Sequence, residues 1–112
     1  MATRAVLGYQ YEDGTIEAIM LDLDGYIENA GNLLAKHYQE PDQARALIKA
    51  GDIEILTASV KTNRRGENGG SVKVIADHEY GFRCLMDKWD ASFSYLYKNG
   101  KWYVSPSVSI GT

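Results

Sequence analysis

The chain has 112 residues, of which 45% are hydrophobic and 24% charged, and its formal net charge is -3 at pH 7. This composition excludes a disordered segment, and the length suits a single hydrophobic core. A lone cysteine leaves no partner for an internal disulfide, and we recognise neither a secretory leader nor a long apolar run. We therefore expect one domain, residues 1–112, in the cytoplasm and not in a membrane.

Acidic residues concentrate near the N-terminus, where residues 1–30 contain six carboxylates against one base, Arg4. A polyanion such as DNA is repelled by that end, so nucleic acid would have to bind to the other half of the chain. An acidic segment of this kind is either a binding face or an ordinary solvated surface.

The first predicted elements are two strands. Apolar and aromatic runs at residues 4–11 and 15–21 flank Glu12-Asp13-Gly14, which is a turn signal, and together they predict a β-hairpin. In the second run apolar residues alternate with a mixed set, which predicts one buried face and one mixed face.

From Tyr26 the apolar residues recur at helical spacing and predict an amphipathic helix. Pro41 suits the first turn of a second helix, which Gly51 ends. Residues 52–60 and 72–76 favour short strands, separated by a polar, glycine-rich loop, and the pattern of residues 78–87 is compatible with a short helix or an irregular cover.

The last element is a β-hairpin whose two runs are joined by Asn99-Gly100, the pair that best accepts positive φ at both turn positions. This turn pairs Lys98 with Lys101 and directs a row of large side chains towards the core. The row consists of Phe93, Tyr95, Tyr97, Trp102 and Val104. The whole order predicts an α+β fold, with an antiparallel sheet from the N-terminal and C-terminal hairpins and an αα-hairpin packed on one face.

One motif suggests catalysis. AIMLDLDGYI resembles the first motif of haloacid-dehalogenase-type phosphatases, in which Asp22 would be the nucleophile, Asp24 the general acid/base and magnesium the cofactor. Tyr26 stands where that family has a threonine, and the chain lacks room for the family's further parallel strands. The same residues begin like a calcium loop but lack its bidentate glutamate. A turn with Asp24 as helix N-cap is the simpler interpretation, so we expect no enzyme activity and no cofactor.

The remaining candidates are binding residues. His37, His78 and Cys84 do not form a zinc-ligand cluster, and we expect the cysteine to be a small buried hydrophobe. Three surfaces stand out: an acidic turn surface, a basic loop that is either a phosphate-binding arm or a solubilising segment, and a set of partly exposed tyrosines that suit interface anchors or base stacking. They comprise Asp22, Asp24, Tyr26 and Glu28, then Lys61, Arg64 and Arg65, and finally Tyr9, Tyr11 and Tyr103, together with Tyr26.

The stretch DGTIEAIMLDLDGYIENAGNLLAKHY resembles a group of small bacteriophage accessory proteins, most of them uncharacterised. In that group a DGT turn and strand lead into a W-DGYP-like turn and a G-x-x-LL helix, and YLYKNGKWYV is similar to the closing hairpin. Leu21, Asp22 and Leu23 stand where the group has Cys-His-Trp, and Ile27 replaces a proline. The matching residues are Asp13, Gly14, Thr15, Asp24, Gly25, Tyr26, Gly31, Leu33, Leu34 and Tyr38.

The resemblance implies a phage product that acts inside the host cell. Its leading implication is a non-catalytic, anti-CRISPR-like inhibitor of a host protein or defence complex. The alternative is a sponge that sequesters a signalling nucleotide between subunits of a homo-oligomer, with a tyrosine on the base and Lys61, Arg64 or Arg65 on the phosphate.

Overall fold

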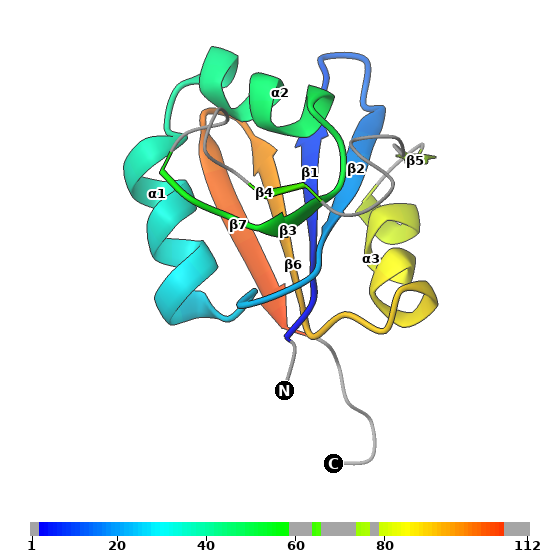
Figure 1. Cartoon of the computed structure of the whole chain (residues 1–112). Helices are drawn as coiled ribbons and strands as arrows, with labels where there is room; N and C mark the ends of the chain where they lie inside the picture. The colour runs from blue at the N-terminus through cyan, green and yellow to red at the C-terminus, as the bar shows by residue number, and fades with distance from the viewer. Residues whose placement is uncertain (1–2, 59–63, 66–73, 77–78, 107–112) are drawn as a thin grey trace.

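The computed structural model of the chain describes residues 3–58, 64–65, 74–76 and 79–106 (Figure 1). The strands are β1 (Ala5–Gln10), β2 (Ile16–Leu21), β3 (Ile53–Ile55), β4 (Arg64–Arg65), β5 (Val74–Ala76), β6 (Phe93–Lys98) and β7 (Lys101–Pro106). The helices are the π-helical turn η1 (Ile27–Gly31), which continues into α1 (Asn32–His37), then α2 (Pro41–Lys49) and α3 (Glu79–Lys88). None of the helices in these described ranges is long and apolar enough to cross a membrane.

The strands form one mixed sheet in the order β4-β3-β2-β1-β6-β7, and β5 also pairs with β2. The α+β class is confirmed, but the expectation of an antiparallel sheet is wrong. β1 is antiparallel to β2 and parallel to β6, and β2 is parallel to β3. The reason is that turn signals specify pairing only within each hairpin, whereas the two hairpins join through their first strands.

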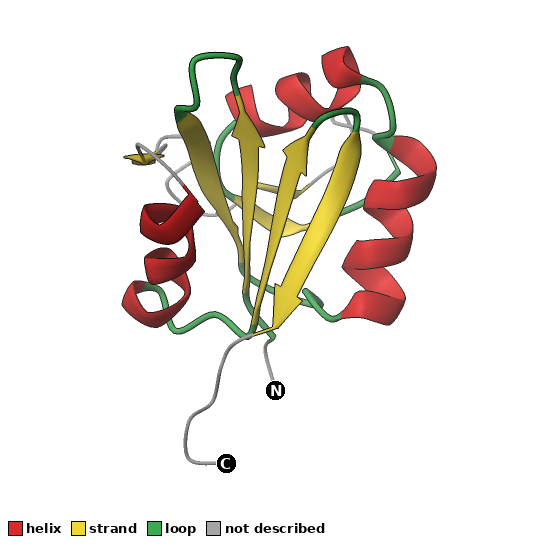
Figure 2. Cartoon of the chain, turned by 180° about the vertical axis from the view of Figure 1, so that it is seen from behind, coloured by secondary structure: helices red, strands yellow, loops and turns green. Residues whose placement is uncertain are grey.

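Helices cover both faces of the sheet, which corrects the expectation of a single covered face (Figure 2). The predicted αα-hairpin, α1 and α2, packs on one face, and α3 packs on the other. Residues of β2 explain this arrangement, because Ile19 and Leu21 are buried towards α1 and α2 while Ile16 and Ala18 are buried in the cluster around Phe82 of α3. Both faces of β2 are therefore buried, not one.

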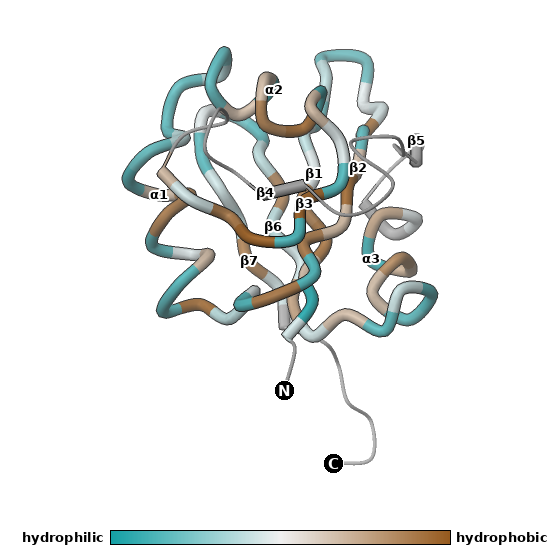
Figure 3. Tube along the Cα trace, in the orientation of Figure 1, coloured by the Kyte–Doolittle hydropathy of each residue, from teal (hydrophilic) through white to brown (hydrophobic). Residues whose placement is uncertain are grey.

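The distribution of hydropathy follows these layers (Figure 3). Hydrophobic residues mark β3 and the side of α2 that faces the sheet, and hydrophilic residues mark the loop between β1 and β2. α3 approaches the sheet closely at Gly8, where an added Cβ would lie 2.4 Å from Cε1 of Phe82. The missing side chain thus makes room for the Phe82 ring.

Polar tips of aromatic side chains fasten the first helical layer to the sheet. Tyr38, Tyr95 and Trp102 pack in or against the apolar cluster on this face, and Tyr97 is buried as well. Each of the four side chains donates to a backbone carbonyl, which satisfies its polar atom. The bonds run from Tyr95 Oη to Gly25 O (2.7 Å), from Tyr97 Oη to Gln39 O (2.7 Å), from Trp102 Nε1 to Tyr38 O (2.9 Å) and from Tyr38 Oη to Thr57 O (2.8 Å).

Several local predictions are confirmed. The C-terminal hairpin has the predicted register, with Lys98 opposite Lys101, and both turn residues, Asn99 and Gly100, have positive φ. α2 begins at Pro41, as predicted, with a reciprocal capping box between Glu40 and Gln43. The ambiguous segment before β6 is the helix α3.

The junction between β2 and η1 differs from the prediction. Tyr26, not Asp24, is the N-cap residue, and no side chain caps this helix. Asp24 instead has a φ of 58°. Gly25 is not among the glycines with positive φ. It is constrained instead by the close approach of the first strand: its N–H donates to Thr3 O at 2.8 Å, and an added Cβ would lie 2.8 Å from the Cβ of Ala5.

We predict that Gly25→Ala destabilises the fold by about 1 to 3 kcal/mol, because the new methyl group overlaps backbone and side-chain atoms of the first strand. Asp24→Gly should change stability by less than about 0.5 kcal/mol, since glycine accepts positive φ without strain. Urea unfolding of both variants measures the difference. A costly Asp24→Gly beside a neutral Gly25→Ala would contradict this description of the junction.

Candidate functional site

An open cleft is formed by the β1–β2 loop, the β6–β7 turn and the start of α2. These three segments lie at the same end of the sheet (Figure 1). Its volume is about 420 Å³. A second hollow of about 440 Å³ adjoins it, shares Tyr9, Gln10, Tyr11 and Glu12, and adds Asp13 and Arg45. The cleft itself is lined by Tyr9, Gln10, Tyr11, Glu12, Gly14, Pro41, Tyr97, Lys98, Asn99 and Gly100.

Three tyrosines form the aromatic wall of this cleft. The rings of Tyr9 and Tyr97 stack at 5.5 Å between centroids with 8° between their planes, because β1 and β6 place these residues side by side in the parallel register. Tyr11 meets Tyr9 edge-on at 5.0 Å and 61°. Trp102 supports Tyr97 from behind in a second edge contact at 5.2 Å. Mutual packing therefore holds the rings in one arrangement.

Tyr11 is also fixed through its hydroxyl group, which donates a hydrogen bond to Glu17. Lys49 of α2 lies 3.3 Å from Oε1 of Glu17 and 5.8 Å from the centroid of the Tyr11 ring. Burial, and then the bond to Glu17, raises the pKa of Tyr11, and the same carboxylate raises the pKa of Lys49. At neutral pH the cluster is thus a neutral phenol beside an ion pair, which orients the tyrosine at the cleft wall.

The rim of the cleft carries charges of both signs. Glu12 and Asp13 are exposed in the β1–β2 loop, and Lys98 lies at the β6–β7 turn, with its Nζ 5.1 Å from the centroid of the Tyr103 ring outside the cleft. Asp13 accepts bonds from the backbone N–H and the hydroxyl of Thr15, and these bonds lower the pKa of Asp13. The arrangement places a flat aromatic surface beside the exposed residues Glu12 and Asp13.

The structure brings together two of the predicted tyrosines, Tyr9 and Tyr11, and both are partly exposed as predicted. Tyr97 was assigned to the core alone, although it also lines the cleft. The signal that locates it is the parallel pairing of β1 with β6, and neither hairpin reveals that pairing. Tyr103 and Tyr26 are exposed too, at 44% and 40%, but they lie outside the cleft.

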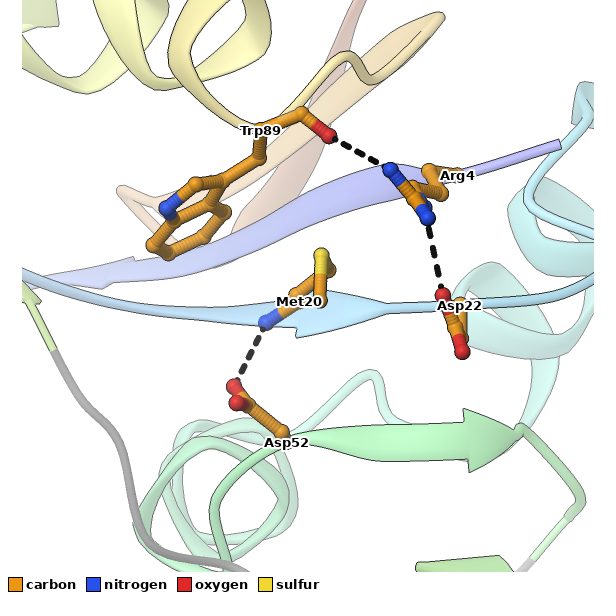
Figure 4. A network of polar contacts seen from close by, with 5 residues as sticks. All are labelled: Arg4, Met20, Asp22, Asp52 and Trp89. Atoms are coloured by element: carbon orange, nitrogen blue, oxygen red, sulfur yellow. Dashed lines mark hydrogen bonds and ion pairs between the residues drawn. The ribbon is translucent and has the colours of Figure 1, made fainter. Parts of the chain in front are cut away.

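The acidic turn surface follows β2 at the opposite end of the sheet from the cleft. Asp22 accepts a hydrogen bond of 3.2 Å from Nε of Arg4, and Nη1 of the same arginine donates to the carbonyl of Trp89 at 3.3 Å (Figure 4). Asp52, which directly precedes β3, accepts a hydrogen bond from the backbone N–H of Met20 in β2. Arg4, which directly precedes β1, thus links Asp22 at the end of β2 to Trp89 at the end of α3. Asp24, Tyr26 and Glu28 are exposed on the same surface.

The other predicted sites are distributed differently from the expectation. Arg64 and Arg65 form strand β4 against β3 and not part of a loop, while Lys61 lies outside the described residues. Cys84 is exposed on α3 and not buried, because it lies on the side of the helix away from the sheet contacts of Phe82 and Leu85. His37 ends α1 at the surface, and His78 is outside the described ranges.

Within the described part of the chain, no group of three or more histidine, cysteine, aspartate or glutamate side chains is arranged to hold a metal ion. Comparisons with protein-family models, with curated proteins and with solved structures found no match. The geometry of the tyrosine-lined cleft is therefore the basis for assigning a site.

We predict that the free energy of unfolding falls above pH about 10, which is the ordinary pKa of a tyrosine side chain. Burial raises the pKa of Tyr11, Tyr95 and Tyr97 in the folded chain, so each stabilises the fold below that pH and loses this contribution as the pH rises through its folded value. Tyr95→Phe should cost about 1 kcal/mol at pH 7 through the lost bond to Gly25, and should reduce the alkaline loss.

Urea unfolding at several pH values measures both effects, with the exposed Tyr26→Phe as the matched control. An unfolding free energy that stays constant to high pH in the unsubstituted protein would contradict the burial of these hydroxyl groups. An equal change in the two variants would contradict the role of the Tyr95 bond.

Proposed function

We propose that the protein acts by binding and without catalysis, as an inhibitor of a host protein or defence complex, and that its partner docks on the tyrosine-lined cleft. The observation that supports this proposal is that Tyr9 and Tyr11 present partly exposed rings in an open cleft of about 420 Å³. The resemblance to bacteriophage accessory proteins supplies the biological setting, since such proteins act on their host.

A protein partner is favoured by the composition and rigidity of the cleft. Tyrosine is enriched among the residues that dominate interface energies, because it offers a large apolar ring with a polar tip. The stacked contact of Tyr9 with Tyr97 and the bond from Tyr11 to Glu17 hold the rings before any partner arrives. Binding therefore costs little side-chain entropy. The charged rim suits the polar border that surrounds interface anchors.

If the partner docks on the cleft, Tyr11→Ala should lower its affinity by about 10- to 100-fold, the usual range for an interface anchor. Glu12→Lys, which reverses a rim charge at an exposed site, should also weaken binding and leave stability unchanged. Tyr26→Ala is the matched control, because it removes an exposed tyrosine at the far end of the sheet.

The partner is first identified by pull-down from host lysate, with a photo-crosslinking residue placed at position 12 or, as control, at position 26. Affinities are then measured by calorimetry with the purified partner. Crosslinking from position 26 alone, or binding that survives both cleft substitutions in folded protein, would move the interface to the acidic turn surface.

A nucleotide sponge is the second candidate, and the size of the cleft favours it specifically. A volume of about 420 Å³ lies within the range of small-molecule sites, and a tyrosine wall can stack on a base. The basic residues expected to hold the phosphate do not line this cleft, where Lys98 is the cationic residue, with Arg45 in the adjoining hollow.

We predict that the protein retains no cyclic nucleotide at micromolar concentration. Mass spectrometry of the denatured protein after incubation and desalting measures retention directly. A retained nucleotide that is lost in Tyr9→Ala and Lys98→Ala, in variants that unfold like the unsubstituted protein, would establish the sponge in place of the inhibitor.

A further inference from the structure

β7 is the outermost strand at one end of the sheet, and β6 is its neighbour on the inner side. The two-residue turn at Asn99-Gly100 makes Lys98 and Lys101 a hydrogen-bonded pair. Bonded and non-bonded pairs then alternate along an antiparallel ladder, so Tyr103 and Ser105 exchange bonds with β6. The backbone N–H and C=O groups of Trp102 and Val104 therefore point away from the sheet.

Two large side chains of β7 are exposed in the described structure, and Nζ of Lys98 lies 5.1 Å from the centroid of one of them, the Tyr103 ring. Tyr103 and Val104 are each 44% exposed, one on the α3 face of the sheet and the other on the α1 face. α3 contacts β1, β2 and β6 through its apolar side chains, and Phe82 and Arg83 of this helix line a small hollow together with Tyr103 and Ser105 of β7. Among the described residues, no other strand pairs with this edge.

We propose that β7 pairs antiparallel with β7 of a second copy of this chain, around a two-fold axis at Tyr103. In this register Trp102 of each copy lies opposite Val104 of the other, and both residues exchange N–H and C=O bonds across the axis. All four outward backbone groups of each copy are then satisfied, which is the condition for a continuous sheet through the dimer.

The ends of β7 fit this register and favour a second copy as the occupant. Pro106 has no N–H to donate, and it lies opposite Gly100 of the other copy, where that strand has already reached its turn. Lys101 lies opposite Ser105, so the lysines of the two copies are at opposite ends of the ladder. A parallel pairing would instead place the two Lys101 side chains next to each other, which like charges disfavour.

The exposed side chains also become complementary in this arrangement. Tyr103 meets its own counterpart at a non-hydrogen-bonded position, where opposing side chains approach most closely. Val104 lies beside Trp102 of the other copy on the face that α1 covers. The pairing thus covers both large apolar residues that β7 leaves exposed. It does not depend on the binding role proposed for the cleft.

Sedimentation equilibrium of the full chain tests the proposal. We expect a concentration-dependent dimer, and Val104→Lys should weaken it about tenfold or more, because a charge at the centre of the edge opposes strand pairing. Ala35→Lys, at an exposed position of α1, is the matched control and should leave the association unchanged. A monomer at every concentration, or a dimer that Val104→Lys leaves intact, would overturn the proposal.

Cysteine crosslinking tests the register in a Cys84→Ser background. Tyr103→Cys should form an intermolecular disulfide, because Cα atoms at a non-hydrogen-bonded position lie about 4.5 Å apart. Lys101→Cys should not, since the two copies of that residue are separated by about four residues of strand, or roughly 13 Å. Crosslinking through Lys101→Cys in preference to Tyr103→Cys would rule out the two-fold axis at Tyr103.

Discussion

β1 forms hydrogen bonds with β2 on one side and with β6 on the other, and this double pairing of the first strand organises the molecule. It joins two local hairpins into one sheet and gives that sheet two faces to cover. It also places Tyr9 beside Tyr97, from which the aromatic wall of the cleft is built. The site is thus a product of the pairing between strands from the two ends of the chain, and neither hairpin contains it alone.

The helical layer depends on the same sheet in a second way. Tyr95, Tyr97 and Trp102 are hydrophobic along most of their length, yet each donates a hydrogen bond from its tip to a carbonyl of the helical segment or its flanks. Because a buried donor without a partner is costly, these bonds specify where the helices sit on the sheet as well as how strongly they pack. The start of α2 is thereby held at the cleft.

Sequence patterns predict the elements whose determinants are local. The register around Asn99-Gly100 and the start of α2 at Pro41 follow from the residues themselves. The parallel pairing of β1 with β6 has no such local signal, since backbone groups make it and any strand can offer them. The position of α3 depends on the lack of a side chain at Gly8, which leaves room for Phe82. In the sequence alone, a glycine within a strand indicates a turn or a bulge, and the packing of Phe82 against it cannot be predicted.

Part of the candidate site likewise has local sequence determinants, and part depends on tertiary contacts. Tyr9 and Tyr11 were predictable as exposed aromatics, because both lie just before a polar turn, whereas the role of Tyr97 requires the tertiary pairing. The acidic residues suggested a surface, but Arg4 reaches Asp22 from a strand that is distant in sequence. Charge patterns alone did not indicate that the same arginine also donates to the carbonyl of Trp89 and so joins the ends of three elements.

The parallel register of β1 with β6 has a consequence for biosynthesis. The strand made first ends up inside the sheet, with Ala5 opposite Phe93, so nearly the whole chain must be synthesised before its second edge is paired. While the nascent chain emerges from the ribosome, that edge of β1 has no permanent partner. The long loop between β1 and β6 can close only near the end of translation, so its entropic cost is met at that stage. A ribosome-bound chain that stops short of β6 should therefore remain a client for chaperones.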